Sequence, residues 1–269
     1  SAASDVYKRQ FNKFCGNTSV SFRQVTRDRL RRYGEHLYDS GLKPNTVSTY
    51  MRMLRSIYNR GVESGSAPYI HGLFRDVYTG VDIRQKKALP MSELRRLLYE
   101  DPKSESLRRT QSIAALMFQF CGMSFADLAH LEKSALDCNV LRYNRIKTRT
   151  PMSVEVLDTA KEVMNQLRNS QPSRPGCPDY LFGILSGNKK RKDERAYREY
   201  QSALRRFNNH LKSLARALRL ASPVTSYTIR HSWATTAKYR GVPIEMISES
   251  LGHKSIKTCL LYTSDAADD

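Results

Sequence analysis

The sequence is short of acidic residues and lacks the features that zinc-binding, disulfide-linked and membrane proteins need. Its 269 residues hold 26 Asp and Glu against 45 Lys and Arg, which leaves a formal net charge of +19. The five cysteines form no Cys-x-x-Cys pair, so neither a zinc knuckle nor a disulfide framework is indicated. No run approaches the roughly 20 apolar residues of a membrane span, and no secretory leader is visible. We therefore expect a cytosolic protein with no metal and no membrane partner.

Positive charge is spread along most of the chain and gives a sequence pI near 9.9. A field of this kind suits a polyanionic partner, and nucleic acid is the first candidate. A basic surface that is only solvated would give the same totals, so charge alone does not identify the partner.

Two amphipathic helices are predicted in the N-terminal part of the chain. Apolar residues recur at helical spacing between positions 25 and 38 behind Thr26, a suitable N-cap, and the helix ends at Gly41. A second helix follows, with Asn45 or Thr46 as its cap, an apolar stripe on one face and arginines on the other. We expect this basic helical hairpin to contact DNA phosphates through Lys43, Asn45, Thr46, Arg52 and Arg55.

The chain is predicted to form two domains. A helical domain covers residues 11–80, a polar basic linker covers 81–88, and a larger domain covers 89–262. Residues 1–10 show no clear periodicity, and they resemble translated sequencing-adaptor read-through, as do residues 259–269. We interpret both ends as non-native and expect residues 1–10 to lie outside the fold.

The larger domain is predicted to be helical with one small β-hairpin. Apolar spacing indicates helices near 92–99, 106–121, 125–131, 157–170 and 196–220. Residues 139–144 and 152–156 alternate apolar with polar side chains, which is typical of two strands of a hairpin. Lys147 then lies near the tip of that hairpin. The predicted fold class is mainly α, of the α+β type.

The residues with the clearest chemistry lie near the C-terminus. Arg230 opens one probable helix and His253 follows the end of the next, so a helix, a turn and a helix can bring them together with Tyr227. An arginine fork suits two phosphate oxygens, and a histidine or tyrosine can donate to a third. Tyr262 could then attack the phosphate, and Lys147 could protonate the leaving oxygen. Each residue alone is more often structural than catalytic, and only their joint spacing indicates a site.

These motifs resemble a known family. Tyr227-Thr-Ile-Arg230-His231-Ser-Trp-Ala-Thr, Leu251-Gly-His253 and then Tyr262 resemble the catalytic half of the tyrosine recombinases, or phage-type integrases. Gly41-Leu-Lys-Pro-Asn-Thr-Val-Ser-Thr-Tyr resembles their core-binding domain. The likeness spans about residues 11 to 262, and its style is closest to the integrases of Bacteroides-type mobile elements.

The resemblance implies a helical, SAM-like core-binding domain and a mixed helical catalytic domain with a small antiparallel sheet. It implies a homotetramer that exchanges strands of double-stranded DNA through a 3′-phosphotyrosine bond, for integration or excision of a mobile element, without a metal or nucleotide cofactor. Arg230 becomes the second catalytic arginine, Lys147 the general acid, His253 the phosphate-binding histidine and Tyr262 the nucleophile. In this domain we expect further DNA contacts from Arg145, Arg149 and Lys254.

Two positions depart from the family pattern. Ser124 occupies the place of the first catalytic arginine, and Tyr227 stands where a histidine is usual, whereas Asp127 matches the acidic residue expected after the first arginine. Loss of one arginine weakens transition-state stabilisation unless another side chain replaces it. Our hypothesis is that one of four arginines reaches the scissile phosphate: Arg108, Arg109, Arg145 or Arg149.

Two alternative functions stay open at this point. A DNA-binding protein of the same fold that no longer cuts would explain Ser124. A basic helical RNA-binding module is a weaker alternative, because neither an RNP-type aromatic strand nor a GxxG loop is present.

Overall fold

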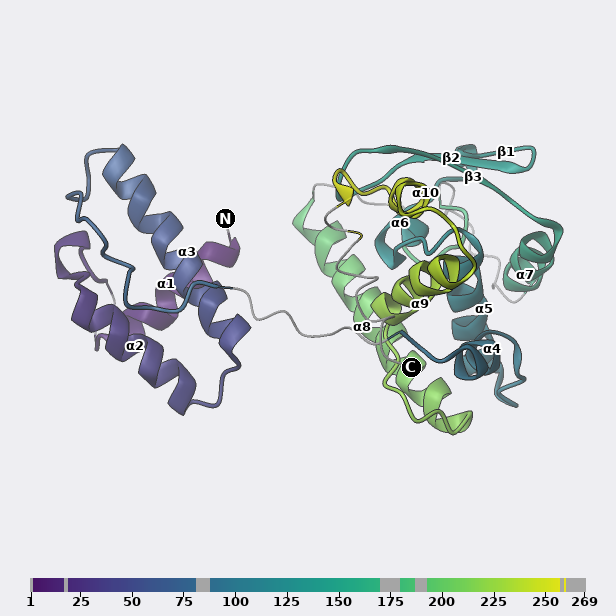
Figure 1. The fold of residues 1–269 in the computed structure, drawn as a ribbon, viewed down its shortest axis with the longest axis horizontal. Helices are drawn as coiled ribbons and strands as arrows, with labels where there is room; N and C mark the ends of the chain where they lie inside the picture. The colour runs from purple at the N-terminus through teal and green to yellow at the C-terminus, as the bar shows by residue number, and fades with distance from the viewer. Residues whose placement is uncertain are drawn as a thin grey trace. The chain divides into compact units, whose positions relative to one another are not determined.

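The computed structural model describes residues 2–16, 19–80, 88–169, 180–186, 193–256 and 259. The chain divides into two compact units, residues 1–84 and 85–269, each with its own hydrophobic core (Figure 1). Most residues of the predicted linker, 81–87, lie outside the described part of the chain.

The N-terminal unit is built from three helices and one 3-10 turn. These are α1 (Ala2–Phe14), η1 (Phe22–Gln24), α2 (Arg27–Asp39) and α3 (Pro44–Glu63). Thr26 caps α2 as predicted, and its side chain accepts a hydrogen bond from the backbone N of Arg29 at 3.2 Å. Leu30 and Met51, both fully buried, join α2 and α3 across the core. The predicted helical hairpin is therefore confirmed.

The expectation that residues 1–10 lie outside the fold is wrong. They form most of α1, which packs against α3. The Tyr7 ring meets Tyr50 edge-on at 4.8 Å, and Phe11, only 4% exposed, meets Tyr33 edge-on at 5.1 Å. The helix was missed because its apolar residues are few and far apart, although together they cover one stripe of the core.

The start of α3 also differs from the prediction. Lys43 is the N-cap residue and Pro44 opens the helix, so Asn45 and Thr46 lie within its first turn. Proline fits the first helical position because its missing N–H would have no partner there and its φ is already helical. This placement outweighs the capping preference of Asn and Thr.

The C-terminal unit is mainly helical with one three-stranded antiparallel sheet. Its strands follow the order β1 (Leu136–Asp137), β2 (Val140–Asn144) and β3 (Pro151–Glu155), and Tyr143 pairs with Met152. The hairpin of β2 and β3 is confirmed, whereas β1 was missed because two residues show no alternation. The helices are α4 (Met91–Tyr99), α5 (Glu105–Gln119), α6 (Phe125–Ala129), η2 (Lys133–Ala135), α7 (Asp158–Asn169), α8 (Glu194–Ala217), α9 (Ser226–Tyr239) and α10 (Ile244–Ser250).

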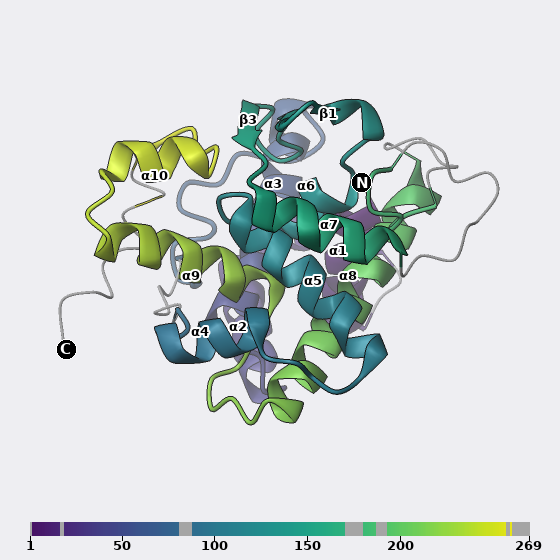
Figure 2. The ribbon, with the colours of Figure 1, turned by 90° about the vertical axis from the view of Figure 1, so that its right-hand side faces the viewer.

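Helix α5 is the centre of this unit. It packs against α4, α7, α8 and α9, which surround it in Figure 2. Its residues Leu116 and Met117 are fully buried, because α5 is the most apolar stretch of the sequence and has neighbours on several faces. The helix ends at Phe120, and the following turn reaches the first turns of α9.

No helix among the described residues is long and apolar enough to cross a membrane.

Phe11 tests whether α1 belongs to the core. We expect Phe11→Ala to lower the free energy of unfolding of the N-terminal unit by about 3 kcal/mol, because the change removes a buried aromatic ring. Lys8→Ala, an exposed change on the same helix, should alter it by less than about 0.5 kcal/mol. Urea denaturation measures both, and equal small effects would show that α1 is not part of the folded core.

Candidate active site

Arg230 joins three separate segments of the C-terminal unit. It lies in the second turn of α9, whose N-terminus is fixed by a capping box between Thr225 and Thr228. Its side chain is buried, at 3% exposure, and Nη1 donates to the carbonyl oxygen of Gly122 at 2.7 Å. Nη2 donates to the carbonyl oxygen of Leu251. The guanidinium thus ties the end of α5 and the end of α10 to α9.

His253 lies beside this arginine. It follows α10, where its backbone N donates to the carbonyl oxygen of Ser248 at 2.9 Å, and its Nε2 is 3.5 Å from Nη2 of Arg230. The pKa of His253 is lowered to about 4, mainly by burial, with contributions from the positive charges of Arg230, Arg145 and Lys147. The imidazole is therefore neutral at pH 7. Lys147 itself is exposed.

A second buried arginine, Arg145, stands next to the same turn. It directly follows β2, is 7% exposed, and donates from Nη1 to the carbonyl oxygen of Gly252 at 2.8 Å. Its Nε lies 3.6 Å from Oδ2 of Asp127, which is also buried. Thr148 donates to the same carbonyl of Gly252 at 3.1 Å. The base of the hairpin is thus fixed to the end of α10.

Asp127 connects Ser124 to the hairpin. Ser124 is the N-cap of α6, and its hydroxyl donates to Oδ2 of Asp127 at 2.7 Å. The other carboxylate oxygen accepts from the backbone N of Ile146 at 2.8 Å. Because the carboxylate is buried, these donors and the guanidinium of Arg145 satisfy a charge that would otherwise be costly.

The remaining predicted residues of this unit are placed differently. Tyr227 is 41% exposed on the first turn of α9, and its ring meets His231 edge-on at 4.6 Å. Arg149 is exposed at the end of the hairpin turn with a φ of +61°, and Lys254 is exposed after His253. Tyr262 lies outside the described residues.

The predicted DNA contacts of the N-terminal unit form two groups. Lys43, Thr46 and Arg52 are exposed and Asn45 is half-buried. Arg55 instead donates from Nη2 to the hydroxyl of Thr79 at 2.6 Å and lies 5.7 Å from the centre of the Phe74 ring. Arg55 thus holds the last segment of this unit against α3.

The contacts of Arg145 and Asp127 went unrecognised in the sequence. Arg145 was expected among the DNA contacts, and the structure places its side chain in a buried position. The sequence did indicate that Asp127 has a cationic partner, because it is an acidic residue inside an apolar segment and a buried acid needs such a partner. The sequence could not say which of several arginines supplies it.

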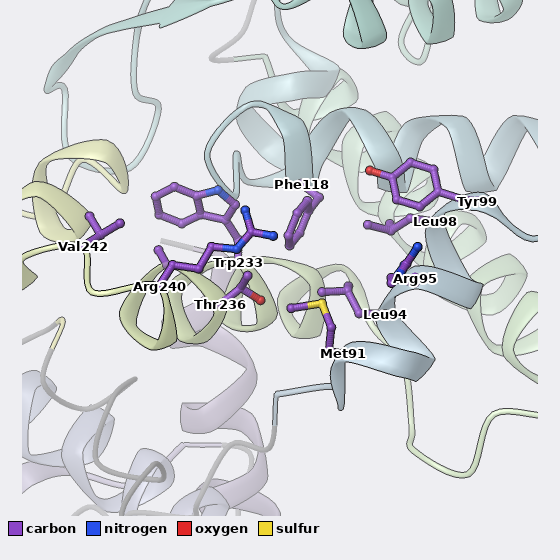
Figure 3. Close-up of a pocket in the computed structure, with 11 residues that line it drawn as sticks. Met91, Leu94, Arg95, Leu98, Tyr99, Phe118, Trp233, Thr236, Arg240 and Val242 are labelled. Carbon is purple, nitrogen blue, oxygen red and sulfur yellow. The ribbon is translucent and has the colours of Figure 1, made fainter.

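A hollow of about 510 Å³ lies elsewhere in this unit, between α4, α5 and α9. Figure 3 shows residues of α4 such as Met91 and Leu94 facing Trp233 and Arg240 of α9 across it. Neither Arg230 nor His253 lines it, so it is separate from the candidate site. Among the described residues, no group of three His, Cys, Asp or Glu side chains could hold a metal ion.

Gly252 gives a stability test with a matched control. Its φ is +63°, and an added Cβ would lie 2.8 Å from Sδ of Met152 and 2.9 Å from Cδ of Arg145. Gly241 has a similar φ of +77° with nothing within 4 Å. We expect Gly241→Ala to cost about 1 kcal/mol and Gly252→Ala about 3 kcal/mol, because only the second adds a clash to the backbone strain. Equal losses in urea denaturation would contradict the packing at Gly252.

The neutral state of His253 predicts a pH dependence of stability. Its folded pKa is about 4 and the ordinary value is 6.5, so the unfolded chain binds the extra proton between these values and stability falls as pH drops from about 6.5 to 4. Because the side chain is half-exposed, we expect a loss of only about 1 kcal/mol at pH 5. His253→Gln should remove this part of the pH dependence in urea denaturation, whereas His71→Gln, an exposed change in the other unit, should retain it.

Two family models match the chain. The phage integrase family matches residues 87–268, and the phage integrase SAM-like domain matches residues 3–70. Tyrosine recombinase XerD of Halalkalibacterium halodurans is 23% identical over 259 residues, which cover 90% of this chain and 78% of that protein. Tyrosine recombinase XerA of Thermococcus kodakarensis is 27% identical over 179 residues, 66% of this chain and 57% of that protein.

Solved structures share the fold over most of the chain. A lambda integrase dimer bound to a COC′ core site has a TM-score of 0.71 at 13% identity, covering 100% of this chain and 88% of that one. A lambda integrase tetramer bound to a Holliday junction has a TM-score of 0.63 at 13% identity, covering 98% and 78%. Since one family model covers more than half of the chain, the chain belongs to the phage integrase family, the tyrosine recombinases.

Proposed function

We propose that this protein is a site-specific recombinase that cuts and rejoins double-stranded DNA through a 3′-phosphotyrosine intermediate, for integration or excision of a mobile element. The observation that carries the proposal is the pairing of buried Arg230 with neutral His253 at the end of α10. A buried guanidinium next to an uncharged imidazole suits a phosphate, because it supplies positive charge and a separate hydrogen-bond donor in a region with little water.

The cleavage step assigns one role to each residue. The hydroxyl oxygen of Tyr262 attacks the scissile phosphorus, and the bond from phosphorus to the 5′ oxygen breaks. The hydroxyl proton passes to solvent water, neutral His253 donates a hydrogen bond to a non-bridging oxygen, and Lys147 gives a proton to the departing 5′ oxygen. Arg230 stabilises the charge that grows on the non-bridging oxygens, and Tyr227, exposed one turn before Arg230, donates to the same phosphate. Attack by a 5′ hydroxyl on the phosphotyrosine reverses these steps.

The position of Lys147 supports its role as the general acid. It lies on the turn between β2 and β3, close enough to His253 to lower the pKa of that imidazole. The base of the turn is fixed through Arg145 and Thr148 to Gly252, the residue that precedes His253. An exposed lysine on a turn held next to His253 suits the protonation of an oxygen on a phosphate bound there.

The partners we propose are duplex DNA and three further copies of the chain. The net charge of +19 supports a polyanionic partner. Lambda integrase, which has the same fold, is bound to DNA as a protein dimer in one structure and as a protein tetramer in another. A homotetramer on paired sites brings two duplexes together. The covalent phosphotyrosine conserves the energy of the broken bond, so the reaction uses no nucleotide or metal cofactor. The protein acts on bacterial DNA in the cytoplasm.

The two units divide the work. Residues 11–80, together with the preceding part of α1, form the core-binding domain, in which the exposed side chains Lys43, Thr46 and Arg52 contact phosphates, with Asn45 beside them. Residues 89–262 form the catalytic domain, in which the exposed Arg149 and Lys254 add phosphate contacts.

A protein of this fold that binds DNA without cutting it is the second candidate, because Ser124 supplies no positive charge. The buried Arg230 and the neutral His253 favour the enzyme.

Tyr262 separates the two candidates. On a nicked suicide substrate that traps the cleaved state, the unmodified chain should form a covalent protein–DNA adduct that resists denaturing gel electrophoresis. Tyr262→Phe should abolish the adduct while binding DNA with unchanged affinity, because only the nucleophilic oxygen is lost. Tyr239→Phe, a change at an exposed tyrosine on α9, should form the adduct normally. An adduct that persists in Tyr262→Phe rules out the assignment, and its absence from the unmodified chain favours the non-cutting candidate.

A further inference from the structure

The catalytic domain lacks a positive charge at position 124. Ser124 uses its hydroxyl to donate to Oδ2 of Asp127, and its oxygen accepts from the backbone N of the same residue at 3.2 Å. Ser124 therefore belongs to the cap of α6 and supplies no charge to a phosphate. If the proposed chemistry takes place, Arg230 needs a second cation from another part of the fold.

Three of the four candidate arginines are unsuited to this task. Arg108 and Arg109 lie near the start of α5, which rises 1.5 Å per residue, so they are roughly 15 Å or more from the end of α5 that contacts Arg230. Arg108 is paired with Asp101 and Glu105 at the surface, and Arg109 donates to the carbonyl oxygen of Phe182. Arg149 is exposed at the outer end of the hairpin turn.

Arg145 resembles Arg230 in its burial and in its partner. The two residues are similarly buried, at 7% and 3% exposure. They donate to consecutive carbonyl oxygens, Arg145 to Gly252 and Arg230 to Leu251, so one turn of the chain holds both guanidinium groups. Both positive charges lower the pKa of His253. The bond to Gly252 uses one of the five N–H donors of the Arg145 guanidinium, and its Nε faces the carboxylate of Asp127 at 3.6 Å.

We infer that Arg145 contacts the scissile phosphate as the second catalytic guanidinium, in place of the arginine that the family carries at position 124. Asp127 makes the exchange possible because one oxygen of its carboxylate, Oδ2, both accepts from the Ser124 hydroxyl and faces Nε of Arg145. The inference deepens the proposed function and rests on it. As Tyr262 attacks and the 5′ oxygen leaves with a proton from Lys147, Arg145 and Arg230 share the negative charge on the two non-bridging oxygens, and no further reactant is needed.

The test measures adduct formation on two nicked substrates, one with an ordinary scissile phosphodiester and one with a neutral methylphosphonate at that position. Arg145→Ala should slow cleavage of the phosphodiester by about 100-fold to 1,000-fold, the usual effect of removing one charge-stabilising donor. On the methylphosphonate, which has no charge to neutralise, the same change should cost less than about tenfold relative to the unmodified chain. A merely structural defect would slow both substrates equally.

Three further variants keep the result decisive. Arg142→Ala, an exposed change on the same strand whose partner is Asp137, should cleave both substrates at the normal rate. Arg145→Ala alone leaves the buried carboxylate of Asp127 without its cation, so a double variant, Arg145→Ala with Asp127→Asn, removes both charges. The double variant should fold and bind DNA normally, and it should still lose cleavage only on the phosphodiester. Adding Ser124→Arg to Arg145→Ala should recover at least tenfold of the lost rate.

The outcomes show whether the role of Arg145 fails alone or the recombinase function fails with it. Equal losses on both substrates, or normal cleavage by Arg145→Ala, overturn the role of Arg145 and leave the recombinase assignment intact, since the unmodified chain still forms the adduct. If the unmodified chain forms no adduct, the proposed function and this inference both fall. A selective loss that Ser124→Arg restores supports both.

Discussion

Two neighbouring carbonyl oxygens at the end of α10 organise the catalytic unit. The carbonyl of Leu251 holds Arg230 from α9, and the carbonyl of Gly252 holds Arg145 from the hairpin. The C-terminal end of a helix is partly negative, so it suits two guanidinium groups that would otherwise repel each other in a buried place. Gly252 makes the arrangement possible because its positive φ turns the chain sharply and no Cβ meets the side chain of Arg145. His253 follows directly, and its position depends on the same turn.

This arrangement explains why the sequence revealed the fold better than the site. The helices of the C-terminal unit follow apolar stripes, as in α5 and α8, and the hairpin strands alternate cleanly at Leu141 and Val154. Such signals are local and were predicted at nearly their observed positions. Helix α1 was missed because its contribution is a pair of aromatic contacts to α2 and α3, which no local pattern contains.

The site depends on contacts between distant positions. Arg230 and His253 could be predicted as a pair because two short helices and one turn separate them. Arg145 could not be separated from Arg149 by sequence, since both are arginines on one predicted turn. What distinguishes them is the buried carboxylate of Asp127, 18 residues before Arg145, and the turn at Gly252, more than a hundred residues after it. No short sequence pattern identifies contact partners that are so far apart in the chain.

The hairpin turn joins the two groups to which the proposed mechanism gives a charge and a proton. Arg145 and Lys147 are two residues apart, and the backbone N of Ile146 between them donates to Asp127. The same turn is bound to Gly252 through Arg145 and Thr148. Under the proposed mechanism, the group that neutralises the phosphate and the group that protonates the leaving oxygen therefore depend on one set of contacts, and a change that loosens the turn would weaken both together.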